Sequence, residues 1–208
     1  NNKTDIIIKH LIPNSLNNKF IIDLFSTVDR DFFVDKNEKS LAYIDEDYFF
    51  DNNRFILKNT TIAKFFKIIE NKKFKKTLNI GATTGYTSIL LSKISTHVFS
   101  LENEVSLHEK AKKNLKFFDI KNIDCIMGEL ENGFLDEKPY DLILVNGCLE
   151  KYPNLLIEQL NKNNGTFLTI EKKNNYLKKI VKYLKKDKLI ERKEYSQVSA
   201  PILKLLNL

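Results

Sequence analysis

The sequence has few of the residues that build metal sites or disulfide frameworks. Its 208 residues include two cysteines, three histidines and no tryptophan. Cys125 and Cys148 fall in apparent strands without metal-ligand spacing, so we expect buried, reduced cysteines and no metal site. No apolar run reaches membrane-spanning length, and the N-terminal residues do not have a signal-peptide pattern. We therefore expect a cytoplasmic protein with no membrane partner.

The composition is that of a globular protein, with 42% hydrophobic and 29% charged residues, and the length suits one well-buried α/β domain. The formal net charge of +7 has two interpretations, an anionic partner or a general bias towards lysine and asparagine. The second is favoured, because the lysines are spread singly and do not alternate with exposed aromatics. The densest basic run, residues 172–193, is where a nucleic-acid face would lie if the first were correct.

The stretch TLNIGATTGYTSILLSKISTHVFSLE, which ends at Glu102, organises the rest of the chain. It predicts a strand, a glycine turn, a helix, a second strand and a terminal acid, in the order 78–80, 81–85, 84–94, 98–101 and Glu102. This is the first half of a nucleotide-binding α/β unit. The glycines let the backbone approach a ligand, and the acid is placed to accept both hydroxyls of a ribose. The spacing fits either a dinucleotide or S-adenosylmethionine, and the alternative is an ordinary βαβ unit with a solvated acid.

Further elements follow from apolar periodicity and turn residues. We expect helices over 17–28, 60–70 (with Asn59 or Thr60 as N-cap), 104–117 and 153–160, and strands over 123–127, 140–146 and 165–170. Residues 35–53 have no clear period and predict a long, ordered loop whose aromatics pack against the protein. Residues 176–195 fit either a helix or a hairpin that turns at 185–188.

Several segments resemble the protein-L-isoaspartate O-methyltransferase family over most of the chain from Val28. Two resemblances are specific to that family: VDRDFFV at 28–34 is similar to its V-P-R-x-x-F-V motif, and AYID at 42–45 to its A-Y-x-D motif. The others are shared with class I methyltransferases generally. They are LNIGATTGY for L-E-I-G-T-G-S-G-Y, SLE for the strand with the ribose acid, Gly128-Glu129 for Gly-Asp, YDLILVNG for F-D-x-I-x-V-T, and residues 198–203 for R-F-V-P-L.

The resemblance implies a divergent member with an α/β, Rossmann-like class I methyltransferase fold. Such a fold has a mostly parallel central sheet, helices on both faces and an antiparallel C-terminal strand pair, so residues 176–195 are expected to form a hairpin. The single domain would comprise a helical and loop cap (1–70), a cofactor-binding core (71–171) and a hairpin region (172–208). The implied cofactor is S-adenosyl-L-methionine. Its implied binding residues are Gly81, Ala82, Thr83, Gly85, Glu102, Gly128, Glu129 and Asn146.

The sequence departs from the family pattern where the acceptor would bind. In a gap-free register the family's two glycines fall on Asp51 and Asn53, its threonine on Phe55, its serine on Leu57 and its Gln-Pro on Lys58-Asn59. The hydroxyls that hold the substrate carboxylate in the family are therefore absent at those positions. Arg54 and Lys58 are the candidates for an alternative carboxylate clamp, although both also suit a solvated surface. The turn itself has Thr83 for the middle glycine and Asn79 for the preceding acid.

We therefore predict carboxyl methyl transfer to a protein, a peptide or a small acid, with residues 45–58 above the reactive methyl and little activity on isoaspartyl peptides. A carboxylate is already an anionic nucleophile at pH 7, so no general base is required. The first alternative is a non-catalytic binding module of the same fold. The second is a methyltransferase with another acceptor, such as nucleic acid. Residues 146–149 disfavour the latter, because they lack the N-P-P-Y-like sequence that presents a base amine.

Overall fold

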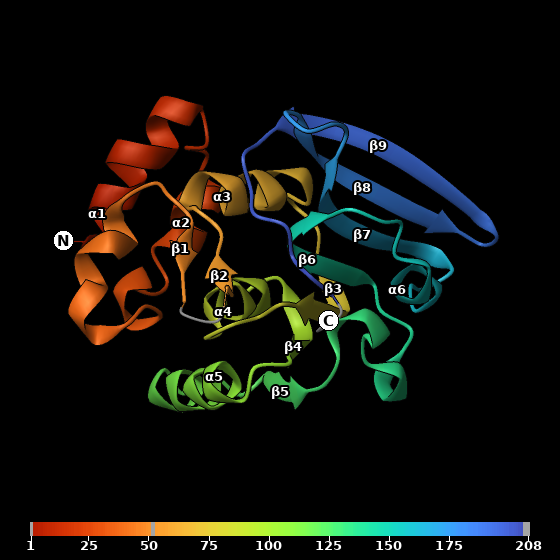
Figure 1. Cartoon of the computed structure of the whole chain (residues 1–208), viewed down its shortest axis with the longest axis horizontal. Coiled ribbons are helices and arrows are strands. Elements are labelled where there is room, and N and C mark those ends of the chain that lie inside the picture. The colour runs from red at the N-terminus through yellow and green to blue at the C-terminus, as the bar shows by residue number, and fades with distance from the viewer. Residues whose placement is uncertain (1, 51–52, 206–208) are drawn as a thin grey trace.

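The computed structural model describes residues 2–50 and 53–205 and is built around a seven-stranded sheet of order β5-β4-β3-β6-β7-β8-β9 (Figure 1). Strands β3 to β7 are parallel, and β8 and β9 extend the sheet antiparallel. The strands are β3 Phe74–Ile80, β4 Ser95–Glu102, β5 Ile123–Met127, β6 Leu142–Leu149, β7 Asn163–Lys172, β8 Lys178–Lys186 and β9 Leu189–Gln197. The expected Rossmann-like fold class is confirmed.

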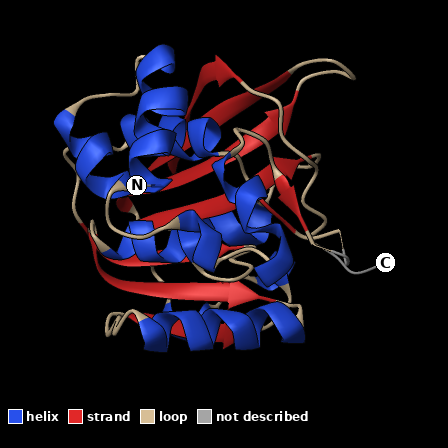
Figure 2. Cartoon of the chain, turned by 90° about the vertical axis from the view of Figure 1, so that its left-hand side faces the viewer, coloured by secondary structure: helices blue, strands red, loops and turns tan. Residues whose placement is uncertain are grey.

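Helices cover both faces of this sheet, with α3, α4 and α5 on one side and α6 on the other (Figure 1). Figure 2, seen from the left-hand side of Figure 1, shows a layer of helices in front of the strands. The α-helices are α1 Asn2–Ile6, α2 Lys19–Phe25, α3 Asn59–Ile68, α4 Tyr86–Ser92, α5 Val105–Phe117 and α6 Asn154–Glu158. Short π and 3-10 segments are η1 Ile7–Leu11, η2 Ile12–Asn14, η3 Arg30–Phe32, η4 Lys36–Tyr43, η5 Leu130–Asn132 and η6 Leu135–Glu137, and β1 Tyr48–Phe49 pairs with β2 Phe55–Ile56.

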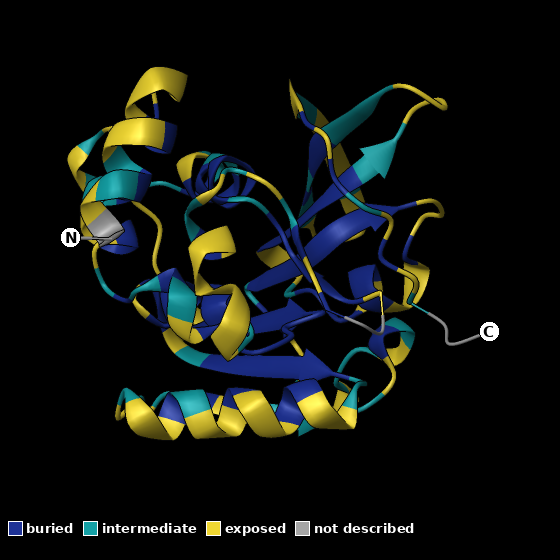
Figure 3. Ribbon diagram, turned by 60° about the vertical axis from the view of Figure 1, so that its left-hand side comes forward, coloured by how far each residue is buried: buried dark blue, intermediate teal, exposed yellow. Residues whose placement is uncertain are grey.

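The core lies between the central strands and their helices. All eight residues of β6 are buried, as a continuous apolar run predicts for a parallel strand covered on both faces. Helix α5 is amphipathic, with Leu107, Ala111 and Leu115 buried on the side that faces the sheet (Figure 3). The chain crosses from β3 to β4 on one side and reaches β6 on the other, so the strand order reverses at β3. Ligands of open α/β sheets bind at the carboxyl ends of strands at such a point.

Most of the expected helices and strands are confirmed, including the C-terminal hairpin, and two expectations about secondary structure are wrong. Residues 178–197 form the hairpin and not a helix. The first error is the predicted loop over 35–53, which contains η4 and also β1, a strand because it pairs with β2. The Tyr48 hydroxyl joins the two segments by donating to Glu38 Oε2 at 2.6 Å. Part of that loop, residues 51 and 52, lies outside the described residues. The division into regions 1–70, 71–171 and 172–208 stays a prediction.

The predicted N-cap of α3 is the second error. Asn59 and Thr60 lie within the helix, and Lys58 is the N-cap without a side-chain cap bond. Asp45 does the capping from a distance, since its Oδ1 accepts from the Thr60 amide at 3.1 Å and its Oδ2 from the Thr60 hydroxyl at 2.7 Å. The aspartate of the A-Y-x-D segment therefore fixes the start of α3.

Candidate cofactor and acceptor site

The turn between β3 and α4 has the backbone that its sequence requires. Gly81, Thr83 and Gly85 have φ angles of +70°, +50° and +95°. The amides of Gly81 and Ala82 both donate to the Leu101 carbonyl at 3.1 Å, which holds the turn against the end of β4. Thr83 adopts a left-handed angle that a β-branched residue rarely takes, so the turn keeps its shape despite the missing middle glycine.

Glu102 lies at the end of β4 with its side chain 1% exposed. Its Oε2 accepts from the Thr83 amide at 2.7 Å and from Arg54 Nη2 at 2.9 Å. Its Oε1 accepts from the amides of Asn103 at 2.9 Å and Glu104 at 3.1 Å. The acid ends β4, as the sequence predicts, accepts from the glycine turn and forms a buried ion pair with Arg54.

A chain of buried polar side chains underlies the turn. Asn146 Nδ2 donates to Asn79 Oδ1 at 2.6 Å and to the Ile80 carbonyl at 2.9 Å. Asn79 Nδ2 donates to Ser88 Oγ at 2.7 Å, and Ser88 shares a hydrogen bond with Ser100 at 2.8 Å. These hydrogen-bonded side chains connect β6, β3, α4 and β4 below the turn. Asn79, the substitute for the family acid, is thus satisfied by neutral partners.

The remaining predicted cofactor residues lie at the next strand end. The Gly128 amide donates to the Glu102 carbonyl at 3.2 Å, so Gly128 borders the acid, whereas Glu129 is exposed at the start of η5. The fold therefore gathers Gly81, Ala82, Thr83, Gly85, Glu102, Asn146 and Gly128 around one turn, with Glu129 at its edge.

Side chains from two distant segments cover this turn. A Cβ atom placed on Gly81 would lie 3.0 Å from Leu203 Cδ2 and 3.2 Å from Arg54 Nη2. One placed on Gly147 would lie 2.6 Å from Leu203 Cβ and 3.0 Å from Phe55 Cζ. Leu203 is held there by its amide, which donates to the Cys148 carbonyl at 2.9 Å. The surface expected to face a cofactor is thus in contact with the chain's own side chains.

The segment that carries Arg54 and Phe55 is anchored by Arg30, which is fully buried. Arg30 Nη1 donates to the Leu57 carbonyl at 2.7 Å and to Asn59 Oδ1 at 3.0 Å, and burial lowers the pKa of its guanidinium. Leu57 is itself 1% exposed. Lys58, the other candidate clamp, directs its Nζ to Ser199 Oγ at 3.1 Å and not to Glu102. The two candidate cations therefore have different partners.

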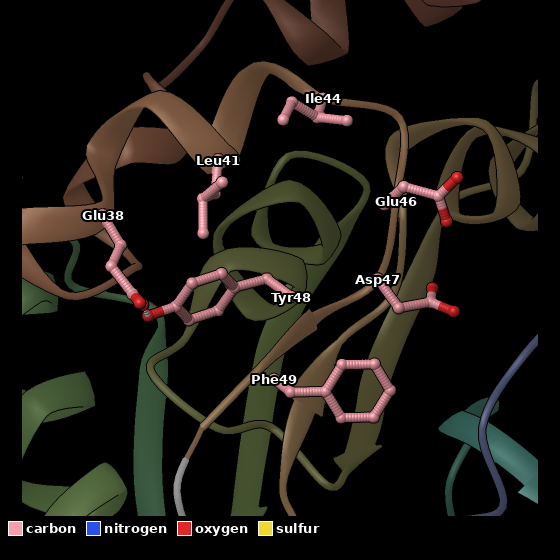
Figure 4. A pocket seen from close by; sticks show the side chains of 7 residues that line it. All are labelled: Glu38, Leu41, Ile44, Glu46, Asp47, Tyr48 and Phe49. Carbon is pink, nitrogen blue, oxygen red and sulfur yellow. Dashed lines mark hydrogen bonds between the residues drawn. The ribbon is translucent and has the colours of Figure 1, made fainter.

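Two pockets lie next to these elements. One of about 400 Å³ adjoins β1 and is lined by Glu38, Leu41, Ile44, Glu46, Asp47, Tyr48 and Phe49 (Figure 4). A larger pocket of about 560 Å³ lies at the carboxyl end of β6, between residues 149–156 and 202–205, with Glu131 on its wall. Leu203 lines the larger pocket and also contacts the glycine turn, so it lies between that pocket and the turn.

Comparison with known proteins decides the family. The profile described as Protein-L-isoaspartate(D-aspartate) O-methyltransferase matches residues 2–202. The chain belongs to this family. A relative from Thermosipho melanesiensis, named protein-L-isoaspartate O-methyltransferase, is 34% identical over 149 residues, covering 70% of this chain and 75% of that protein. One of the same name from Vibrio atlanticus is 26% identical over 183 residues, covering 88% of each.

A solved structure, also named protein-L-isoaspartate O-methyltransferase, has the same fold. It matches with a TM-score of 0.82 at 20% identity, covering 98% of this chain and 66% of the solved chain. The present chain is thus a methyltransferase, and S-adenosylmethionine is its expected cofactor. Among the described residues, no helix is long and apolar enough to cross a membrane.

The residues at the turn offer hydrogen-bond acceptors of the kind that S-adenosylmethionine requires. The Glu102 carboxylate faces the turn, and within the described part of the chain the buried Oδ1 atoms of Asn103 and Asn146 have no hydrogen-bond donor. Such atoms are suited to the hydroxyl and amino groups of a ligand. The arrangement differs from the sequence expectation in one respect, because Arg54 and Leu203 lie where glycine leaves room.

The sequence did not indicate the partner of Glu102. Arg54 is predicted only as an acceptor clamp or a surface cation, whereas it is 7% exposed and paired with an acid 48 residues away. The one local signal is the apolar run Phe55, Ile56 and Leu57 that follows it, which carries the backbone into the core. The covering role of Leu203 has a similar origin, since it depends on how the C-terminal segment pairs with β6.

Proposed function

We propose that the protein transfers a methyl group from S-adenosylmethionine to a carboxylate of a protein or peptide. A small-molecule acid is the alternative acceptor. The observation that carries the proposal is Glu102, placed at the end of β4 and facing a glycine turn at the reversal point of the sheet. The acceptor class comes from the relatives, which are named protein-L-isoaspartate O-methyltransferase.

The cofactor supplies a methyl group on a positively charged sulfur. The chain's own contribution is placement, because a carboxylate is ionised at pH 7 and needs no base. Residues 81–85 and Glu102 bind on one side, and the hairpin with Arg54 and Phe55 closes the other side and excludes water. We keep Arg54 and Lys58 as candidates that orient the acceptor carboxylate, with Lys58 already on the surface next to Ser199.

Base-labile methylation tests this function. The protein is incubated with S-adenosylmethionine labelled at the methyl group and with a mixture of proteins or peptides, and released methanol is measured after mild base, because carboxyl methyl esters hydrolyse there. We expect base-labile label that disappears in Glu102→Ala. Label that resists base, or label on nucleic acid, would contradict the proposal. The cytoplasmic location expected from the sequence stays a prediction.

A further inference from the structure

The Glu102 carboxylate has its hydrogen-bonding capacity filled by the protein. Two carboxylate oxygens offer about four lone-pair positions. The amides of Thr83, Asn103 and Glu104 and the Arg54 guanidinium occupy four. A ribose that binds this acid through its hydroxyls must therefore replace at least one of these donors.

Arg54 is the donor that is able to leave. The three amides belong to the turn and to the residues directly after β4, so they are fixed by the same backbone that positions the acid. Arg54 comes from a different segment, just before β2, and reaches Glu102 with a long side chain that is 8% exposed. Its Nη2 also lies 3.2 Å from the Cβ position of Gly81, against the face of the turn.

We propose that Arg54 is an internal ligand of the cofactor site, which occupies the ribose position on Glu102 and is displaced when the cofactor binds. This inference rests on the proposed function for the position of the cofactor, and it does not depend on which acceptor is methylated. The guanidinium neutralises a carboxylate that would otherwise be buried without a counter-charge. Cofactor binding therefore competes with a charge-assisted hydrogen bond inside the protein, which lowers the affinity for the cofactor.

Calorimetric titration with S-adenosylhomocysteine tests the proposal in the full chain. Arg54→Gln keeps a polar side chain but removes the charge, and we expect it to bind about tenfold more tightly or better, about 1.4 kcal/mol. Arg192→Gln is the matched control, since this arginine also pairs with a carboxylate, that of Glu171 at 2.7 Å, but lies in β9 of the C-terminal hairpin. Its affinity is expected to stay within about twofold, roughly 0.4 kcal/mol.

Glu102→Gln supplies the second half of a double-variant cycle. If Arg54 acts through this acid, Arg54→Gln gains nothing in the Glu102→Gln background, and the two changes are not additive. Arg54→Lys, which keeps the charge on a different head group, is expected to fall between the parent and Arg54→Gln. It is also the variant to use if Arg54→Gln does not fold, as judged by circular dichroism.

Unchanged or weaker binding by folded Arg54→Gln would overturn the proposal, because Arg54 would then be neutral or a cofactor ligand. Absence of binding by every folded variant would overturn it too, since removing the guanidinium would not have opened the site. Binding with the expected pattern but no methyl transfer would leave this inference standing and contradict only the proposed function. The two failures are therefore distinguishable.

Discussion

Asn79→Ala tests whether the polar chain below the turn replaces the acid that the family carries there. Asn79 is fully buried, accepts from Asn146 at 2.6 Å and donates to Ser88 at 2.7 Å. Two buried hydrogen bonds contribute about 0.5–1.5 kcal/mol each, and the small cavity adds roughly 1 kcal/mol. We therefore expect the free energy of unfolding to fall by about 2–4 kcal/mol, and the melting temperature by roughly 5–15 °C.

The assay is urea denaturation followed by circular dichroism, with the same measurement on Asn37→Ala. Asn37 is exposed in η4, so its change is expected to stay within about 0.5 kcal/mol. Asn79→Ala also removes one of the two partners of the Asn146 amide, so cofactor affinity should fall as well. A loss of stability below about 1 kcal/mol would refute the reasoning, since a buried amide with two partners cannot be removed so cheaply.

Three further predictions follow from particular residues. Gly85→Ala should lower stability by about 1–2 kcal/mol, because its φ is +95° while the nearest side-chain atom, of Ala111, leaves room at 3.6 Å; a thermal melt within about 1 °C of the parent would contradict this. In a labelled-methyl assay, this protein should methylate isoaspartyl peptides at least about tenfold more slowly than a standard repair enzyme does. The reason is that Leu57 is a buried apolar residue in place of a hydroxyl. Comparable turnover would show that another group orients the substrate carboxylate. Burial raises the pKa of the Cys125 and Cys148 thiols to about 11. Their alkylation at pH 8 should therefore be about 100-fold slower than that of an exposed cysteine, and it should accelerate as the pH rises towards 11. Rapid labelling of the native protein at pH 8 would contradict this prediction.

The parallel core was predictable because a strand buried on both faces requires a continuous apolar run in the sequence. The run from Leu142 to Val145 is apolar at every position, and few structures other than a central strand suit it. The sequence of β8 predicts its secondary structure less clearly. Its apolar residues also fit helical spacing, and the pairing with β7 and β9 that makes it a strand is a property of the sheet and not of the segment.

The site divides in the same way. The position of Glu102 at the end of β4 was predictable from its distance to the glycine turn along the chain, and its role towards the cofactor stays a prediction. Its ion pair with Arg54 was not predictable, because that contact depends on how the β1–β2 hairpin packs over the sheet. Asp45 shows the same limit: its motif was recognised, but its capping of α3 across 15 residues was assigned to Asn59 or Thr60.

A crystal structure with S-adenosylhomocysteine tests the central claim most directly. We predict the ribose hydroxyls on Glu102, the ligand against residues 81–85, and the Arg54 side chain moved away from the acid. The sulfur should face the hairpin that carries Arg54 and Phe55. A ligand bound elsewhere, or a ligand at the turn with the 2.9 Å contact between Arg54 and Glu102 unchanged, would contradict the account.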